Sequence, residues 1–270
     1  MAIPYAFSGN IPALYDACLG PLFFEFSAAD LAERVGAAVT SGRLLELACG
    51  TGISTEFLRK RLPAAVSIAA TDINPAMLGF AREHRGSLDG VTFDIADALD
   101  LPHDDDSFDA VVCQFGIMFF PDLAQGLEQM RRVLRPGGVV ACNVWDGFSS
   151  NPIAALAFET IGAFFDDEPP RFLEVPFGNC PLEPTLGLFR AAGFEGMEGH
   201  IVEATVETSV PHDVARGLVE GNPGIAEIHA RASAKPEAIV AAVEAALIRE
   251  FGPTPLRIPM CEIVYTGTAP

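Results

Sequence analysis

Residues 44–58 read LLELACGTGISTEFL, an apolar run that ends in a two-glycine turn and continues into a helix-like segment. A short apolar run that ends in glycine is typical of a strand buried on both faces of a sheet. Gly50 and Gly52 allow the backbone a tight turn and a close approach to a ligand. Because ligands of open α/β sheets bind at the carboxyl ends of the strands, this turn is the first candidate for a binding site.

The same rhythm of strand and helix continues downstream. Further strands are expected at residues 66–73, 91–99, 108–120 and 139–145, with helical segments between them. Strands that alternate with helices at this spacing predict βαβ units and a parallel sheet covered on both faces. With two later strand-like runs included, the sequence predicts an α/β, Rossmann-like, doubly wound and mostly parallel seven-stranded sheet with helical cap insertions.

The chain outside the strand-rich region has a different composition. We expect one domain, residues 1–270, made of N-terminal helices (1–41), a ligand-binding core (42–146) and two insertions that cover a substrate (147–180 and 211–253). The N-terminal helices are expected to break near Gly20 and Pro21, and Ser27 is expected to cap the helix that follows.

Composition restricts the class of protein. Seventeen basic and thirty-six acidic residues give a net charge of −19, which repels phosphate backbones, so we expect no nucleic-acid partner. No apolar run reaches the roughly 18 residues of a spanning helix, and the first residues lack the pattern of a signal peptide. The six cysteines contain no C-x-x-C pair, so we expect no metal site and reduced thiols. These features predict a cytoplasmic protein without membrane insertion.

Acidic residues stand at or near the ends of three successive predicted strands. Asp72 follows Gly50 by twenty-two residues and can accept two hydrogen bonds from a ribose diol, and Asp97 would lie beside an adenine. Glu46 suits a ligand with an ammonium group, or it only organises the turn; both interpretations remain open. The third glycine of the dinucleotide fingerprint is replaced by Thr55, which counts against a nicotinamide or flavin cofactor.

Several stretches of residues 42–146 resemble, in order, the motifs of the class I S-adenosylmethionine-dependent methyltransferases. ELACGTG resembles the first motif and ATDINPAML the second, while IADALDLPHDDDSFDAVVCQFGIMFFPD resembles the third and fourth. RVLRPGGVVACNVW resembles the helix, turn and fifth strand that follow. The similarity is greatest to the small-molecule branch that includes the ubiquinone and menaquinone methyltransferases.

The resemblance implies that the cofactor is S-adenosyl-L-methionine and that the product is S-adenosyl-L-homocysteine. The implied cofactor-binding residues are Tyr15, Glu46, Ala48, Cys49, Gly50, Gly52, Asp72, Ile73, Met77, Asp97, Ala98, Gln114 and Phe115. Of these, Glu46, Ala48, Gly50, Gly52 and Gln114 would surround the methionine part, Asp72 would bind the ribose hydroxyls, and Ile73, Met77, Asp97 and Ala98 would contact the adenine.

The resemblance also implies methyl transfer to a small, apolar or aromatic metabolite by in-line displacement. Met118 and Trp145 are candidates for acceptor-binding residues, although Trp145, like Tyr15, is also interpreted as a packed core residue. No catalytic base is identified; His103, beside three aspartates, is interpreted as part of a solvated loop. An NAD(P)-dependent oxidoreductase and a non-catalytic cofactor-binding protein remain as alternatives, and the oligomeric state is undetermined.

Overall fold

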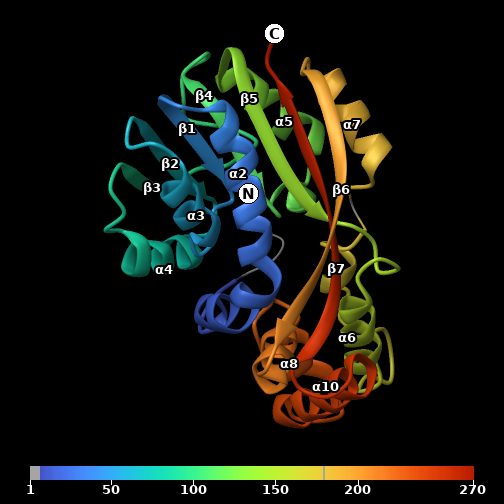
Figure 1. Ribbon diagram of the computed structural model, residues 1–270. Helices are drawn as coiled ribbons and strands as arrows, with labels where there is room; N and C mark the ends of the chain where they lie inside the picture. Colours follow the sequence, from blue (N-terminus) through green and yellow to red (C-terminus); the bar gives the residue numbers. More distant parts are fainter. Residues whose placement is uncertain (1–6, 179) are drawn as a thin grey trace. The chain divides into compact units, whose positions relative to one another are not determined.

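The computed structural model describes residues 7–178 and 180–270. Its strands are β1 (Gly42–Leu47), β2 (Val66–Asp72), β3 (Val91–Ile95), β4 (Phe108–Gln114), β5 (Leu134–Trp145), β6 (Glu195–Thr208) and β7 (Leu256–Thr268). Among the described residues they form one seven-stranded sheet in the order β3-β2-β1-β4-β5-β7-β6 (Figure 1). Strand β1 pairs in parallel with β2 and β4, as does β2 with β3 and β4 with β5. The predicted α/β fold with a mostly parallel, seven-stranded sheet is confirmed.

Helices connect the strands and cover the sheet. The longer helices are α2 (Glu25–Ala38), α3 (Ile53–Arg61), α4 (Pro75–Arg85), α5 (Leu123–Val133), α6 (Pro152–Gly162), α7 (Leu182–Ala191), α8 (Pro211–Glu220) and α10 (Pro236–Phe251). The shorter ones are α1 (Ile11–Leu14), the π-helix η1 (Tyr15–Phe24), η2 (Ile117–Phe119), η3 (Phe172–Glu174) and α9 (Ile225–Arg231). Figure 1 shows α2 and α3 on one face of β1–β5, with α5 and α7 on the other.

The order of the strands places the two-glycine turn at the point where the chain changes direction across the sheet. Strand β1 lies between β2 and β4, so the connections after β1 and β4 run to opposite sides. Such a switch leaves a crevice outside the carboxyl ends of the strands, where ligands of this architecture bind. Leu44 and Leu45 of β1 are fully buried, as are Val111 and Val112 of β4, as expected for strands covered on both faces.

Contacts divide the chain into two compact units. Of the described residues, unit 1 holds 7–24, 145–178 and 203–261, and unit 2 holds 25–144, 180–202 and 262–270. The glycine turn and the ends of β1, β2 and β4 all belong to unit 2. The role of segments 147–180 and 211–253 as a substrate cover stays a prediction. Within the described residues, no helix combines the length and the apolarity needed to cross a bilayer.

Two local predictions in the N-terminal region are wrong. Gly20 and Pro21 do not break the helix, because they lie inside η1, which leads directly into α2. Proline removes one bond from a regular helical ladder, and the chain widens into a π-helix there instead of ending. Ser27 does not cap a helix either: α2 begins at Glu25, and Ser27 is fully buried inside it.

Candidate functional site

The turn after β1 has an unusual backbone. Ala48, Gly50 and Gly52 all have positive φ angles of 52°, 57° and 85°. Glycine adopts this conformation freely, whereas a non-glycine residue there costs about 1–3 kcal/mol and is retained only where its surroundings enforce it. The turn is fastened to β2, because the N–H of Cys49 donates to the carbonyl oxygen of Thr71 at 2.9 Å. The strained turn follows the last residue of β1 and leads directly into α3. It therefore lies at the carboxyl edge of the sheet.

Asp72, at the end of β2, holds two loops at once. One carboxylate oxygen accepts the N–H of Gly50 at 2.8 Å, and the other accepts the N–H of Asn74 at 2.7 Å. Burial raises the pKa of the Asp72 carboxyl, while these two backbone hydrogen bonds act to lower it. Each carboxylate oxygen can accept further hydrogen bonds, so acceptor capacity remains for the two hydroxyls of a diol. The ribose contact of Asp72 stays a prediction, but its tie to the glycine turn is a feature of the structure.

Glu46 lies beneath the turn and is completely buried. One carboxylate oxygen accepts a hydrogen bond from the hydroxyl of Ser54 in α3, and the other has no partner among the described residues. Burial raises the pKa of Glu46 to about 7, although the Ser54 and Thr55 hydroxyls act in the opposite sense. Glu46 thus joins β1 to the start of α3 and organises the turn, and its contact with a ligand stays a prediction.

The residues expected to pack on an adenine differ in exposure. Ile73 follows Asp72 and is 40% exposed, which is high for a large apolar side chain at a strand end. Met77 is buried in the first turn of α4, and its terminal methyl group lies 3.5 Å from the place where a Cβ on Gly50 would stand. The exposed face of Ile73 is therefore the one available to a flat apolar ligand.

Asp97 and Ala98 lie in the loop that follows β3, and both are half-buried. The Asp97 carboxylate accepts the N–H of Leu99 at 2.9 Å, which closes a local turn. The carbonyl oxygen of Leu99 in turn accepts a hydrogen bond from the Gln125 side chain of α5 at 2.9 Å. The predicted adenine side of the site is thus held in place by helix α5.

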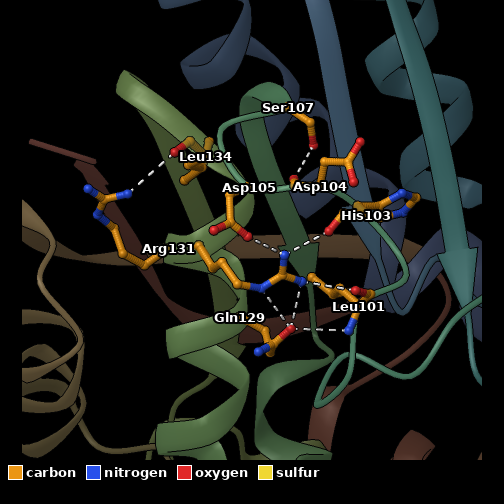
Figure 2. A network of polar contacts seen from close by, with 9 residues as sticks. Leu101, His103, Asp104, Asp105, Ser107, Gln129, Arg131 and Leu134 are labelled. Atoms are coloured by element: carbon orange, nitrogen blue, oxygen red, sulfur yellow. Dashed lines mark hydrogen bonds and ion pairs between the residues drawn. The ribbon is translucent and has the colours of Figure 1, made fainter.

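A second contact from α5 fixes the rest of this loop (Figure 2). The guanidinium of Arg132 donates to the carbonyl oxygens of Leu101 at 2.9 Å and His103 at 2.7 Å. It also pairs with the carboxylate of Asp105 at 2.7 Å and with the side-chain oxygen of Gln129 at 2.9 Å. Figure 2 shows the loop residues gathered around this helix, with Gln129 also accepting from the N–H of Leu101. The planar guanidinium of Arg132 therefore joins acceptors of the loop to helix α5.

We expect Arg132→Lys to destabilise the fold by about 2 kcal/mol, because a lysine ammonium cannot span the fork of acceptors. Denaturation by urea measures the loss, and hydrogen exchange should locate it in residues 99–106. Arg131→Lys is the matched control, since Arg131 donates to the neighbouring Leu134 carbonyl at 3.3 Å and does not hold this loop. Equal stability of the two variants would contradict the assignment.

The turn after β4 meets the glycine turn directly. Gln114 ends β4 and is buried, and Phe115 follows with a positive φ of 50°. A Cβ on Gly116 would stand 2.5 Å from the sulfur of Cys113 and 2.6 Å from the Cβ of Ala48. The absence of a side chain at Gly116 therefore lets the backbones of the two turns approach each other.

Gly116→Ala is expected to displace the turn after β4 and to weaken cofactor binding, with a stability loss of about 1–3 kcal/mol from overpacking. Gly79→Ala is the control, because Gly79 is exposed in α4 and a Cβ there meets nothing within 4 Å. This second change should leave stability equal or raise it by up to about 1 kcal/mol through helix propensity. Thermal melting, together with titration of the cofactor, separates the two.

The structure brings most of the predicted cofactor-binding residues together in unit 2. Those at or beside the carboxyl ends of β1–β4 are Glu46, Ala48, Cys49, Gly50, Gly52, Asp72, Ile73, Met77, Asp97, Ala98, Gln114 and Phe115. Met118, a predicted acceptor contact, lies in η2 just beyond the β4 turn and is 5% exposed. The individual ligand contacts of these residues stay predictions.

Comparison with known proteins agrees with this geometry. Residues 44–138 match the model of a methyltransferase domain family. This stretch of the chain is therefore similar to a methyltransferase domain. Demethylmenaquinone methyltransferase of Clavibacter sepedonicus is 40% identical over 121 residues, which is 44% of this chain and 46% of that protein. The chain thus matches less than half the length of such curated relatives.

Solved structures extend the likeness of fold beyond residues 44–138. Phosphoethanolamine N-methyltransferase 2 of Haemonchus contortus, in complex with S-adenosyl-L-methionine, has a TM-score of 0.60 and 17% identity, covering 96% of this chain and 56% of that one. The [4+2]-cyclase SpnF has a TM-score of 0.58 and 20% identity, covering 96% and 93%. At these identities the structures show the fold alone. The predicted resemblance to class I methyltransferases is confirmed.

The two remaining predicted residues lie in unit 1, outside the methyltransferase domain match. Tyr15 stacks on Phe24 at a ring separation of 4.6 Å. Trp145 is 4% exposed and stacks on Phe177 at 5.9 Å. These surroundings favour the interpretation of both residues as packed core, and their ligand contacts stay predictions.

Several residues that shape the methyltransferase domain had no predicted role. Asn74 caps α4 by accepting the N–H of Ala76 at 2.9 Å, and its place before Pro75 was a recognisable capping signal. Ser54 carried no such signal, because only the folded chain brings it to Glu46. His103 lies in the predicted loop, but it is only partly exposed, and burial lowers its pKa.

Proposed function

We propose that the protein transfers a methyl group from S-adenosyl-L-methionine to a small, apolar or aromatic metabolite. The observation that carries this proposal is the joined pair of turns in the methyltransferase domain, with Asp72 bonded to the N–H of Gly50 at 2.8 Å. A carboxylate held at the end of β2 beside a left-handed glycine turn suits a ligand that has a ribose and a compact zwitterionic tail. No observation favours a nicotinamide cofactor.

The residues present fit this cofactor. The backbone at Gly50 carries no side chain that would fill the turn, and exposed Ile73 offers an apolar face at the end of β2. The second oxygen of Glu46 is buried without a hydrogen-bond partner among the described residues. A cationic group bound above the turn would stabilise a negative charge on Glu46 through space, without direct contact.

Methyl transfer from a sulfonium depends on the positioning of the reactants more than on acid–base groups. When bound, S-adenosyl-L-methionine supplies a methyl group activated by a sulfonium centre. The two strained turns and Asp72 would fix its orientation, and correct alignment of reacting atoms can lower a barrier by several kcal/mol. The buried apolar side chains of Phe115 and Met118 would exclude water from the sulfonium, which loses its positive charge as the methyl group leaves. We assign no residue as a general base.

An aromatic acceptor is supported by the composition of unit 1. A continuous series of rings, each near the next, runs through Phe172, Phe7, Tyr15, Phe24, Trp145, Phe177, Phe148 and Phe158. Trp145 packs inside this series, whereas its partly exposed members Phe7, Phe148 and Phe158 offer stacking surfaces for flat apolar molecules. Demethylmenaquinone, named for the relative above, is the first acceptor to test, and segments 147–180 and 211–253 are the proposed sources of acceptor contacts.

Calorimetric titration with S-adenosyl-L-methionine, S-adenosyl-L-homocysteine and NADH in separate runs tests the cofactor. We expect binding of both sulfur compounds and none of NADH. Methyl transfer from labelled cofactor to a demethylmenaquinone analogue then tests the enzyme. Binding of NADH alone would overturn the proposal, and cofactor binding without turnover on any acceptor would favour a non-catalytic protein.

A further inference from the structure

Strand β7 carries a single acidic residue in an otherwise apolar stretch, MCEIVY at residues 260–265. This residue, Glu262, is fully buried. A buried carboxyl group is costly unless it is hydrogen-bonded, so its partners indicate what it does. One oxygen accepts a hydrogen bond from the side-chain nitrogen of Asn143 at 2.7 Å, and the other has no regular hydrogen bond among the described residues.

Asn143 lies on β5, is fully buried, and connects Glu262 to Phe115 in the turn after β4. Its side-chain oxygen accepts the N–H of Phe115 at 3.3 Å, and its backbone carbonyl accepts the same N–H at 3.0 Å. An ionised carboxylate only accepts hydrogen bonds, so Glu262 decides which end of the Asn143 amide faces it. The nitrogen of that amide turns toward Glu262, and the oxygen is left for Phe115.

The N–H group held in this way belongs to the strained turn after β4. Phe115 has a positive φ of 50°, and the next residue, Gly116, packs on Ala48 of the glycine turn. A backbone in this conformation persists only where its surroundings over-determine it. The series Glu262, Asn143, Phe115 and Gly116 therefore runs from the far side of β5 to the cofactor side of the domain.

We propose that Glu262 is a positioning residue: through Asn143 it fixes the backbone of Phe115 and, with it, one wall of the cofactor site. The link to a cofactor rests on the function proposed above, whereas the positioning of Phe115 stands without any ligand. Nothing in the four motifs that resemble the methyltransferases includes β7, so this residue adds a distant element to the site.

The charged and polar groups that act on Glu262 come from β5 and α2. On α2 they are Ser27, Asp30 and Arg34, and the last two pair with each other at 2.6 Å. Burial raises the pKa of Glu262 to about 7; Ser27 and Asn143 lower it, Asp30 raises it and Arg34 lowers it. The Ser27 hydroxyl acts to lower the pKa of the Glu262 carboxyl, although it makes no regular hydrogen bond to it in this structure. The protonation of Glu262 should therefore change near neutral pH. Titration of Glu262 can then test whether its state affects the backbone of Phe115.

The sequence contains a single Gln–Phe step, residues 114–115, which makes a selective test feasible. Carbonyl-¹³C glutamine together with ¹⁵N phenylalanine gives one filtered amide signal, that of Phe115. The background is Glu46→Gln, because Glu46 also titrates near pH 7. We expect the signal to shift with a midpoint near pH 7 in this background and to stay constant when Glu262→Gln is added. A signal that does not move between pH 5.5 and 8.5, or that moves equally in both proteins, would overturn the proposal.

A second arm measures the effect on binding of S-adenosyl-L-homocysteine. Glu262→Gln keeps an acceptor for Asn143 and should bind within about twofold of the parent, whereas Glu262→Leu should bind about tenfold more weakly. Equal binding by the leucine variant would contradict the role in the cofactor site. If the parent binds no S-adenosyl-L-homocysteine, the proposed function fails while the amide signal still decides the positioning. If the leucine variant does not fold, the titration of Glu262→Gln decides alone.

Discussion

Asp72→Ala should weaken binding of S-adenosyl-L-homocysteine by about 3 kcal/mol or more, roughly a hundredfold. The loss is larger than that of a ribose contact alone, because the same carboxylate holds the N–H groups of Gly50 and Asn74. Hydrogen bonds to a charged acceptor are worth about 1.5–3 kcal/mol, and removing the acceptor leaves both donors unpaired. Calorimetric titration measures the affinity, and circular dichroism confirms that the variant is folded.

Two further variants define the cause of that loss. Asp94→Ala removes a carboxylate from neighbouring β3 that is 67% exposed and only loosely paired with Arg82 at 3.9 Å, so it should bind like the parent. Asp72→Asn keeps the size of the side chain but turns one acceptor into a donor that faces an N–H group. It should therefore behave like Asp72→Ala. Parent-like affinity in Asp72→Asn would show that the carboxylate does not organise the turn.

Stability should fall as the pH rises from about 4.5 to just above 7, because two carboxyl groups are buried without full pairing. Burial raises the pKa of both Glu46 and Glu262 from 4.5 to about 7. A folded-state pKa above the unfolded one means that the native state binds more protons between these two values, so ionisation opposes folding. The predicted loss begins near pH 4.5 and is complete just above pH 7. A difference of this size corresponds to about 3 kcal/mol for each group.

Glutamine variants isolate this effect from the rest of the titration. Glu46→Gln and Glu262→Gln cannot ionise, so the double variant should lose less stability than the parent between pH 5.5 and pH 8.5. Urea denaturation at the two pH values gives the four free energies of unfolding. His103 has the opposite effect on stability. Its pKa is lowered in the folded protein, so the folded state gains stability as the pH rises toward 6.5. Because His103 is present in both proteins, this effect cancels in the comparison. Equal pH dependence in parent and double variant would show that the two glutamates are ionised at no cost.

The order of strands and helices in residues 42–146 could be predicted because it depends on local patterns. Apolar runs, glycine turns and the proline at the start of α4 each act within a few residues, so the sequence displays them directly. Asp72 and the glycine turn were also recognisable, since acids and glycines at the ends of successive parallel strands must gather at one edge of the sheet.

The polar contacts that shape the site in detail could not be predicted from local patterns. Ser27 looked like a helix cap, yet it is buried inside α2 beside Glu262, a residue 235 positions further along the chain. Asn143 and Phe115 are joined through the register of β4 and β5, which no local pattern reveals. The fold and the position of the glycine turn followed from the sequence, because hydrophobic periodicity and turn chemistry are local. Which buried polar groups meet depends on packing between distant segments, and only the folded chain settles that.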